Sequence, residues 1–414
     1  MLSPVSAEVV RATLPVVRDH AVEITGVFYP SMFAAHPDLL DLFNQGNQAS
    51  GQQRVALASA VVAYAGHLLD PAAAPFAPIA ERIAHKHVSL GIRAEQYPIV
   101  GRHLMAAVGT VLGDAVTAEV AAAWDEVYRL LAGELIAAEA RLYERGGVDP
   151  LAPWRRWRVA KRQDEAVDAV SFTLVPDDGD PVPDFAPGQY VSVVVDLPDG
   201  HRQPRQYSLS QGPARDSLRI TVRRVRGRDD APDGVVSNHL HDRLHADHTI
   251  LVGPPAGEHT LAPGTGPVLL VSGGIGITPT ASMLDHIART DPTRRVVVAH
   301  AERSRDRHAL HAEIDHLAAG LTDTDVLTWY ENGGDGRPGR IDLDAVPLPE
   351  GVTAHLCGPL PFMRHVRDGL LRRGVPADRV HYEVFGPGMI DNAGGIGAAS
   401  GPSVPPVSRT GTPW

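Results

Sequence analysis

Cysteine is almost absent from this chain: Cys357 is the only one in 414 residues. A single cysteine excludes an intrachain disulfide and any metal or cluster site that needs several cysteines. Long apolar runs are absent too, and none approaches the roughly 18 residues of a membrane helix. The N-terminus lacks the basic and apolar segments of a secretory signal. We therefore expect a cytoplasmic protein with no integral membrane segment.

Positive charge is scarce, because 38 Lys and Arg stand against 49 Asp and Glu, a net charge of −11. This balance argues against nucleic acid or an anionic membrane as the main partner. Hydrophobic residues make up 43% and charged residues 21% of the chain, which excludes wholesale disorder. The length suggests roughly two to four domains.

Composition changes along the chain and predicts three folded domains of different class. Residues 1–145 have helical periodicity and little glycine, which predicts an all-α domain. Residues 154–264 consist of short β-branched runs, such as 190–195 and 218–225, typical of an antiparallel sheet or barrel. Residues 265–387 begin with strand 268–272, helix 279–289 and strand 295–301, a βαβ unit that predicts an α/β domain with a parallel sheet.

Two segments fall outside these domains. The stretch from Glu144 to Pro150 has the composition of a linker, which we place at residues 146–153 between the first two domains. Residues 388–414 are dominated by Gly, Pro, Ala and Ser, and we expect them to form a disordered tail.

The predicted helices carry polar residues on their apolar faces. Gln53 lies on the same helix face as Leu57, and His87 lies on a face with apolar residues of its own helix. Glu139 lies in a stripe of large side chains. Each such group costs free energy in a core unless it finds a partner. Ordinary paired core residues are one interpretation. A buried cofactor is the other, with His87 binding a haem iron on one side and Gln53 and Tyr29 donating hydrogen bonds on the other.

These segments resemble the globin half of the flavohaemoglobins. The matching residues are 28–33 (FYPSMF), 42–44 (LFN), 53–57 (QRVAL), 86–87 (KH) and 95–97 (EQY). The resemblance implies that His87 is the proximal haem ligand and that Phe43 packs on the haem. It further implies a distal pocket of Tyr29, Gln53 and Leu57, and a hydrogen-bonded triad of His87, Tyr97 and Glu139. A tie between two helices is the alternative role for Tyr97 and Glu139.

The middle domain contains residue types that suit a flavin nucleotide. Arg205-Gln206-Tyr207-Ser208 follows a predicted strand and turn at Pro204, and an Arg can hold a phosphate while a Tyr stacks on a flat ring. The spacing places Tyr190 on the adjacent strand, and Gly234–Asn238 offers a helix N-terminus. Together these motifs resemble the FAD domain of the ferredoxin–NADP reductase superfamily, which implies a six-stranded antiparallel barrel.

The third domain contains a glycine turn between a strand and a helix. Its residues are Gly274, Ile275, Gly276, Ile277, Thr278 and Pro279. Such a turn lets a pyrophosphate approach the backbone and a helix N-terminus, and it resembles the nicotinamide-binding turn of the same superfamily. Cys357-Gly358-Pro359 resembles the second motif on that side. Arg303 and Arg305 are open to two readings, a contact with a 2′-phosphate or a position facing solvent.

The end of the third domain resembles the segment that lies against the flavin in this superfamily. Its residues are Val384, Phe385, Gly386 and Pro387, with Val384 in place of the family's cysteine. Lys86 and Glu383 are expected to tune the redox groups by facing each other across a haem–flavin gap. Solvated surface charge is the alternative for this pair.

The order of the three domains resembles a flavohaemoglobin over residues 1–387. The resemblance implies haem b, FAD and NAD(P)H as cofactors, with His87 on the iron. It implies a nitric oxide dioxygenase that converts NO and O2 to nitrate, electrons passing from NAD(P)H through FAD to haem. The expected partners are small molecules, O2, NO and NAD(P)H, and the expected state is a monomer. An oxygen or NO store or sensor, and a haem-linked reductase of peroxide or ferric iron, are the alternatives.

Overall fold

The computed structural model describes residues 1–43, 52–72, 75–197, 200–227 and 232–383. Contacts within the described chain separate two compact units, and each is described by itself. Of the described residues, the first holds Met1–Ala84 and Ile92–Arg141, and the second holds His85–Gly91 and residues 142–383. Across the described residues, every helix is too short or too polar to span a bilayer.

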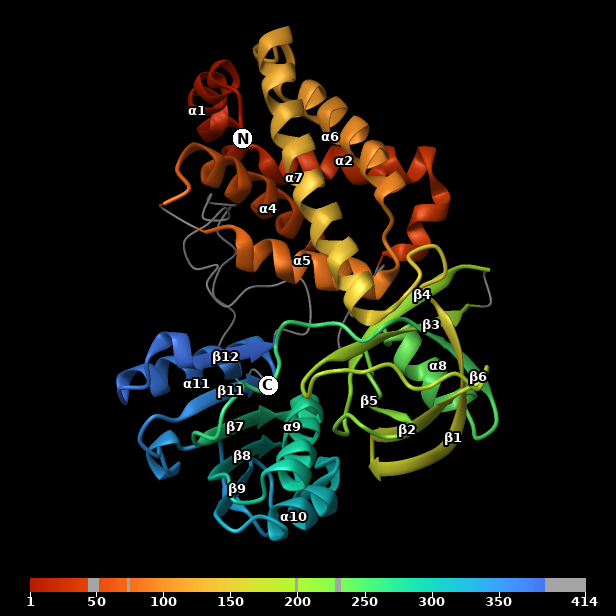
Figure 1. Cartoon of the computed structure of the whole chain (residues 1–414), viewed down its shortest axis with the longest axis vertical. Coiled ribbons are helices and arrows are strands. Elements are labelled where there is room, and N and C mark those ends of the chain that lie inside the picture. Colours follow the sequence, from red (N-terminus) through yellow and green to blue (C-terminus); the bar gives the residue numbers. More distant parts are fainter. Residues whose placement is uncertain (44–51, 73–74, 198–199, 228–231, 384–414) are drawn as a thin grey trace. The chain divides into compact units, whose positions relative to one another are not determined.

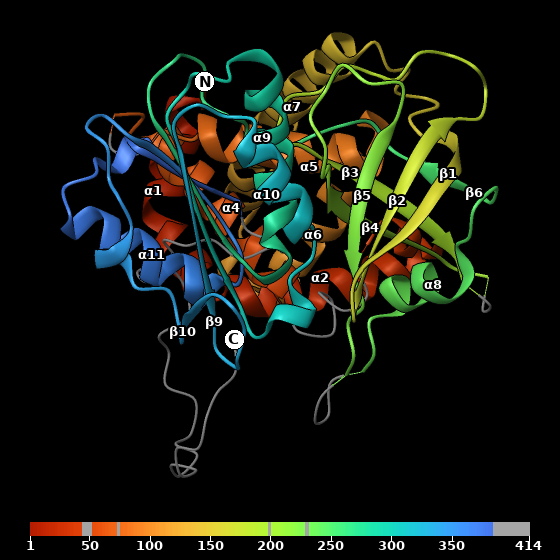
Figure 2. The same ribbon diagram turned by 90° about the horizontal axis from the view of Figure 1, so that it is seen from below.

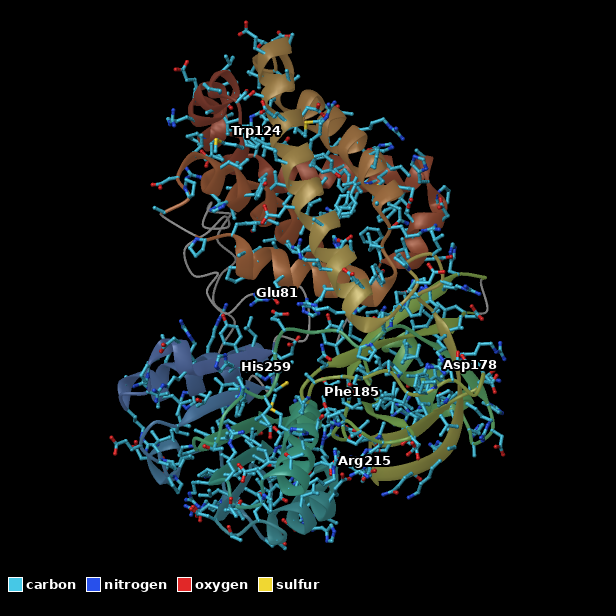
Figure 3. The ribbon with its side chains drawn as sticks, viewed as in Figure 1. Glu81, Trp124, Asp178, Phe185, Arg215 and His259 are labelled. Atoms are coloured by element: carbon cyan, nitrogen blue, oxygen red, sulfur yellow. The ribbon has the colours of Figure 1, made fainter. Side chains whose placement is uncertain are left out.

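The first unit is built from helices packed around a large apolar core (Figure 1). The helices are α1 (Pro4–Asp19), α2 (Ala21–Ala35), α4 (Gln52–Leu69), α5 (Ala77–Leu90), α6 (Tyr97–Leu112) and α7 (Ala118–Gly146). The last residues of α5 and of α7 belong to the second unit. Trp124 of α7, labelled in Figure 3, lies in this core with Phe28 and Met32 of α2. The predicted apolar stripe of α7 is buried, since Tyr128, Leu131 and Leu135 all belong to the core.

Helix α7 ends at the start of the predicted linker. It continues through Glu144 and Arg145 to Gly146, the first residue of the predicted segment 146–153. Glu and Arg are good helix formers, so nothing before the glycines interrupts the helix. The chain leaves the helical conformation at Gly147, which has a φ of +60°, as is usual where a glycine ends a helix.

The second unit contains an antiparallel sheet whose two edges meet, as predicted for a barrel (Figure 2). Its strands are β1 (Arg155–Ala166), β2 (Ala169–Pro176), β3 (Tyr190–Asp196), β4 (Arg202–Ser208), β5 (Leu218–Arg223) and β6 (Thr249–Val252), in the order β4-β3-β6-β1-β2-β5. An antiparallel bridge between Leu209 and Ile220 connects the ends of the order, the chain after β4 and strand β5. Helix α8 (Val235–Arg243) begins at the predicted Gly234.

Pro204 does not form the predicted turn. It lies inside β4 and pairs with Val194 of β3. A proline cannot donate to a sheet, but β4 is at the end of the strand order and pairs along its length with β3 alone. An edge strand tolerates a missing N–H on its outer side. This is why the proline that predicted a turn lies within a strand.

A parallel sheet forms the rest of the second unit. Its strands are β7 (Val268–Gly273), β8 (Val296–Glu302), β9 (Thr324–Tyr330), β10 (Arg337–Pro338), β11 (Thr353–Cys357) and β12 (Val380–Glu383), with helices α9 (Ile277–Thr290), α10 (His311–Ala319) and α11 (Leu360–Arg372). The order β10-β9-β8-β7-β11-β12 places β7 between β8 and β11. The chain order therefore reverses at the carboxyl end of β7, the position where open α/β sheets bind ligands.

Ion pairs join the barrel to the parallel-sheet module. Asp285 of α9 is buried and accepts hydrogen bonds from the Gly212 N–H at 2.7 Å and from Arg215 at 2.7 Å; Figure 3 labels Arg215. Arg219 of β5 pairs with Glu313 of α10 at 2.6 Å. Burial alone raises the pKa of Asp285, but the hydrogen bonds from Arg215 and Gly212 outweigh it and hold this pKa below its ordinary value.

Replacing Asp285 by Asn is expected to destabilise the second unit in a pH-dependent way. Because the folded pKa is depressed, the stabilisation is present above the ordinary Asp pKa and is lost as pH falls through the folded value. At neutral pH we expect a loss of about 2–4 kcal/mol, reduced from that of a fully buried pair because Arg215 is partly exposed. Urea unfolding at pH 7 and near pH 3 measures both effects. Asp242→Asn removes an exposed pair with Arg224 and serves as the control with little expected change; equal losses in the two variants would contradict the assignment.

Candidate functional site

An aromatic cluster in the helical unit surrounds one buried hydroxyl group. The ring of Tyr29 lies 5.8 Å from that of Phe33 and 5.8 Å from that of Phe43. Burial raises the pKa of Tyr29, so its hydroxyl stays protonated and can donate a hydrogen bond at any physiological pH. Leu57 of α4 is half-buried against the same core. Gln53 lies in the first turn of α4, and its side chain falls outside the described part of the structure.

A second polar pair links α6 and α7 inside the helical unit. The Tyr97 hydroxyl donates to Glu139 Oε1 at 2.5 Å, and both side chains are buried. The Tyr128 hydroxyl in turn donates to the Tyr97 carbonyl at 2.6 Å. The sequence places Tyr97 and Glu139 together correctly. Their hydrogen bond fixes the orientation of a buried carboxylate, which would suit the N–H of an imidazole as a further donor.

Helix α5 carries three consecutive residues of interest, His85, Lys86 and His87. His87 is half-buried in the last turn, in the part of α5 that belongs to the second unit. Burial lowers the pKa of Lys86, and the charge of Glu383, at the end of β12, opposes that shift. The two charges therefore lie close enough to interact. His85 is buried and its Nδ1 accepts from the Gly257 N–H at 3.0 Å, a contact that the sequence analysis missed.

Strand β4 presents the predicted flavin-binding residues. Arg205 donates only to neutral acceptors, Gln203 Oε1 at 3.3 Å and the Pro204 carbonyl at 2.7 Å, and burial lowers its pKa. Among the described residues, no carboxylate forms an ion pair with it. A largely desolvated guanidinium without an acidic partner is suited to a phosphate. The Gln206 amide donates to Ser192 Oγ at 3.3 Å.

Tyr190 and Tyr207 lie on neighbouring strands of the barrel. Tyr190 pairs across β3 and β4 with Ser208, which is buried, as the spacing predicted. Burial raises the pKa of both tyrosines, so both hydroxyls remain protonated donors. Gly257 packs against Tyr190, because a Cβ there would lie 3.0 Å from the tyrosine ring.

The glycine turn at the end of β7 leaves no room for a side chain at Gly276. A short 3-10 turn, Gly274–Gly276, leads directly into α9, with Ile277, Thr278 and Pro279 in the first helical turn. Gly274 has a φ of +57°, which favours glycine. A Cβ on Gly276 would lie 2.3 Å from the Cys357 carbonyl oxygen. The backbone of two neighbouring strand ends thus meets at the switch point of the sheet, where a dinucleotide phosphate would approach.

Cys357 is buried at the end of β11, and burial raises the pKa of its thiol. It is therefore held as a neutral thiol, in keeping with a lining role and not a nucleophilic one. Arg305 is half-exposed and pairs with Asp335 at 3.3 Å, while the Arg303 N–H donates to Glu302 at 2.8 Å. The predicted flavin contacts Val384, Phe385, Gly386 and Pro387 lie outside the described residues.

Buried histidines beside the glycine turn also escaped the sequence analysis. His300 of β8 hydrogen-bonds Ser272 of β7 at 2.8 Å, and its ring stacks on His308 with 4.1 Å between centroids. Burial lowers the pKa of His300 to about 3, so the ring is neutral. The only available signal was a histidine interrupting the apolar run of β8, which is too weak to distinguish this pair from an exposed side chain.

Comparison with known proteins places these features in one family. The family model for globins matches residues 26–135, and that for the oxidoreductase NAD-binding domain matches residues 270–368. The flavohemoprotein of Bordetella parapertussis is 45% identical over 94% of this chain and 100% of its own length. The flavohemoprotein of Chromobacterium violaceum is 43% identical over 93% of this chain and 98% of its own.

This chain belongs to the flavohaemoprotein family. The flavohemoglobin of Malassezia yamatoensis, solved with bound FAD and heme, has a similar structure with a TM-score of 0.84, 31% identity and coverage of 93% of this chain and 100% of that one. The FAD/NAD-binding domain of nitric oxide dioxygenase from Vibrio cholerae matches 56% of this chain and 98% of its own, with 34% identity and a TM-score of 0.53.

Membership confirms the predicted fold classes and their order in this flavohaemoprotein, and the assignment of haem, FAD and a nicotinamide nucleotide as its cofactors. For the residues that would hold those cofactors, the structure supplies distances, burial and charge.

Gly276→Ala is expected to weaken binding of the nicotinamide nucleotide. The added Cβ would lie 2.3 Å from a backbone oxygen of residue 357, so the strand end or the glycine turn must move. We expect the Kd for NADH, measured by fluorescence titration, to rise about tenfold or more, since small displacements of a binding backbone are costly. Gly109→Ala in α6, where a Cβ would meet nothing within 4 Å, is the matched control with unchanged binding. An unchanged Kd in both variants would count against the turn as a nucleotide site.

Proposed function

We propose that this flavohaemoprotein is a cytoplasmic, monomeric nitric oxide dioxygenase that converts NO and O2 to nitrate with electrons from NAD(P)H. The observation that best supports this proposal is that one chain contains both a globin-like unit and a flavin- and nucleotide-binding unit. A gas store or sensor needs no dedicated supply of electrons, so this junction favours an enzyme. The similarity to a domain of the Vibrio cholerae nitric oxide dioxygenase supports the specific reaction.

The proposed division of labour follows the sequence boundaries. Residues 1–145 would form the haem domain, 146–153 the linker, 154–264 the FAD domain and 265–387 the nicotinamide domain, with 388–414 as a tail. When bound, haem supplies an iron centre for the gases, and FAD converts a two-electron donor into single-electron steps. The remaining chemistry belongs to the residues of this chain.

The polar side chains on the helices suit haem b. His87 provides an imidazole for the iron, and no cysteine is required. The carboxylate of Glu139, oriented by the Tyr97 hydroxyl at 2.5 Å, would accept the other N–H of that imidazole and make the ring a stronger electron donor. Tyr29, kept protonated by burial, would donate a hydrogen bond on the opposite side together with Gln53. Phe43 and Leu57 would exclude water there.

The residues that suit FAD in the barrel are Arg205 and the tyrosines of β3 and β4. Arg205, which lacks a carboxylate partner among the described residues, would hold a phosphate. Tyr207 and Tyr190 would lie against the flat ring system, with Gln206 and Ser208 nearby on β4. Phe385, with its neighbours from Val384 to Pro387, would cover the ring where the nicotinamide enters. Lys86 and Glu383 would set the local field between flavin and haem.

The glycine turn fits the pyrophosphate of NAD(P)H. The backbone of Gly274, Ile275 and Gly276 has no Cβ obstruction on its glycines, and α9 points its N-terminus at the same place. Thr278 and Pro279 complete the first helical turn, and the Thr278 hydroxyl is held by the Ile275 carbonyl at 3.0 Å. These residues would orient the nucleotide so that hydride leaves toward the flavin.

Aerobic NO consumption driven by NADH tests the proposal. With an NO electrode, we expect the purified holoprotein to consume NO with production of nitrate, because the proposed sites would bind the gases and pass on electrons from NADH. A sensor or store would show no turnover. A peroxide or ferric reductase would oxidise NADH at a rate indifferent to NO, and either result would overturn the proposal.

His87→Ala tests the residue assignment within the same assay. Without an imidazole at this position we expect loss of the haem Soret band and of NO consumption, while NADH-dependent reduction of ferricyanide through the flavin continues. His103→Ala on α6 is the matched control, since His103 is half-buried like His87 but hydrogen-bonds Ser31 at 3.2 Å. Normal haem content in the His87 variant would refute the ligand assignment.

A further inference from the structure

The last turn of α5 and the residue after it pack tightly on the flavin module. We call His85–Gly91 the α5 docking turn; it belongs to the same compact unit as the barrel. A Cβ on Gly253 would lie 2.8 Å from the Ser89 carbonyl oxygen, and one on Gly91 would lie 2.9 Å from the Pro153 ring. The Ser89 side chain also hydrogen-bonds Tyr190. The docking turn is therefore fixed by several close contacts.

His85 makes the direct polar link in this contact. Its Nδ1 accepts a hydrogen bond from the Gly257 N–H at 3.0 Å, in a buried setting. An accepting Nδ1 requires the neutral ring with its proton on Nε2. A buried N–H without an acceptor is costly. The hydrogen bond therefore favours one position of the docking turn against the loop of Gly257.

Gly257 links the position of the docking turn to the strands proposed to bind flavin. Its φ is +118°, and a Cβ at this position would meet the Tyr190 ring at 3.0 Å. Its carbonyl accepts from Gln189 Nε2 at 3.2 Å, next to Tyr190. The position of His85 is thus coupled through Gly257 to the tyrosine proposed to lie against the flavin.

His85 and His87 are two residues apart on one helix. At about 100° per residue they lie on different sides of α5. A single turn can therefore hold the flavin loop with one imidazole and leave the other for the iron. The positions of both imidazole rings then depend on the same short stretch of helical backbone.

We propose that His85 is a positioning residue for electron transfer, which holds the helix carrying His87 at a fixed separation from the flavin-binding loop. The proposal rests on the proposed haem and flavin sites. In the step concerned, the reduced flavin is oxidised by one electron and ferric haem iron is reduced to ferrous, with no bond made or broken at His85. Electron transfer slows steeply with separation, so a loosened docking turn should act on this step and spare hydride transfer.

The test compares two substitutions in the full-length holoprotein. His85→Phe keeps a ring but removes the acceptor, whereas His85→Asn places Oδ1 near the position of Nδ1. Anaerobic stopped-flow measurements with NADH follow flavin bleaching and haem reduction separately, with carbon monoxide to trap ferrous haem. Amide hydrogen exchange of the Gly257 N–H supplies a readout independent of turnover.

For His85→Phe we expect faster exchange at Gly257, flavin reduction within about twofold of wild type, and haem reduction slowed about tenfold or more, as for other displaced reacting groups. His85→Asn should restore both haem reduction and protection. Thr13→Val is the control for lost stability alone, because it removes a hydrogen bond of 2.9 Å from Trp124 in the helical unit; its electron transfer should be normal.

Faster exchange with unchanged haem reduction in His85→Phe would overturn the proposal, since His85 would then be structural only. Failure of His85→Asn to restore the rate would also contradict it. If His85→Phe does not fold, the smaller His85→Leu replaces it with the same expected results. These outcomes are independent of NO: wild-type protein that reduces its haem but consumes no NO defeats the dioxygenase proposal and leaves this one intact.

Discussion

The cost of burying a polar or charged group without a partner is the constraint on which this structure depends. Tyr97 and Glu139 satisfy each other inside the helical unit at 2.5 Å. Asp285 pairs with two arginines and accepts a hydrogen bond from a backbone N–H where α9 meets the barrel. His85 accepts the buried Gly257 N–H. Arg205 departs from the pattern, since it is largely desolvated but donates only to neutral groups. In a flavohaemoprotein, that departure is the natural place for a cofactor phosphate.

The same constraint explains how the second unit stays together. The barrel and the parallel sheet are joined by Asp285 with Arg215, Arg219 with Glu313 and Arg223 with Glu302. Directional pairs of this kind fix one relative placement of two modules better than an apolar contact does. The docking turn of α5 adds a third element to the barrel through His85 and Ser89. The residues proposed to bind flavin and nucleotide thus belong to the same compact unit as His87.

Local patterns in the sequence predicted much of this arrangement. Helical periodicity identified the buried face of α7, and the pairing of Tyr97 with Glu139 followed from the family resemblance. The glycine turn before α9 was recognisable because strand, turn and helix adjoin in the sequence. Such features depend on neighbours a few residues apart, and the matching family models confirm the order of domains.

Features set by distant parts of the chain were missed or wrong. The expectation of a turn at Pro204 failed because only the strand order reveals β4 as an edge strand. His85 could not be assigned, because its partner Gly257 is 172 residues away. Likewise, only the folded structure shows that Arg205 has no acidic partner among the residues it describes. A sequence shows which residues are costly to bury, but it does not show where each finds its partner.

The central claim is that electrons from a nicotinamide nucleotide reach a haem held by His87 through a flavin in the same chain. The most direct measurement is the absorption spectrum of the purified protein before and after anaerobic addition of NADH. The account predicts combined haem and flavin bands, with bleaching of the flavin followed by conversion of the haem to its ferrous spectrum. Absence of either set of bands, or a haem that stays ferric while the flavin is fully reduced, would contradict it.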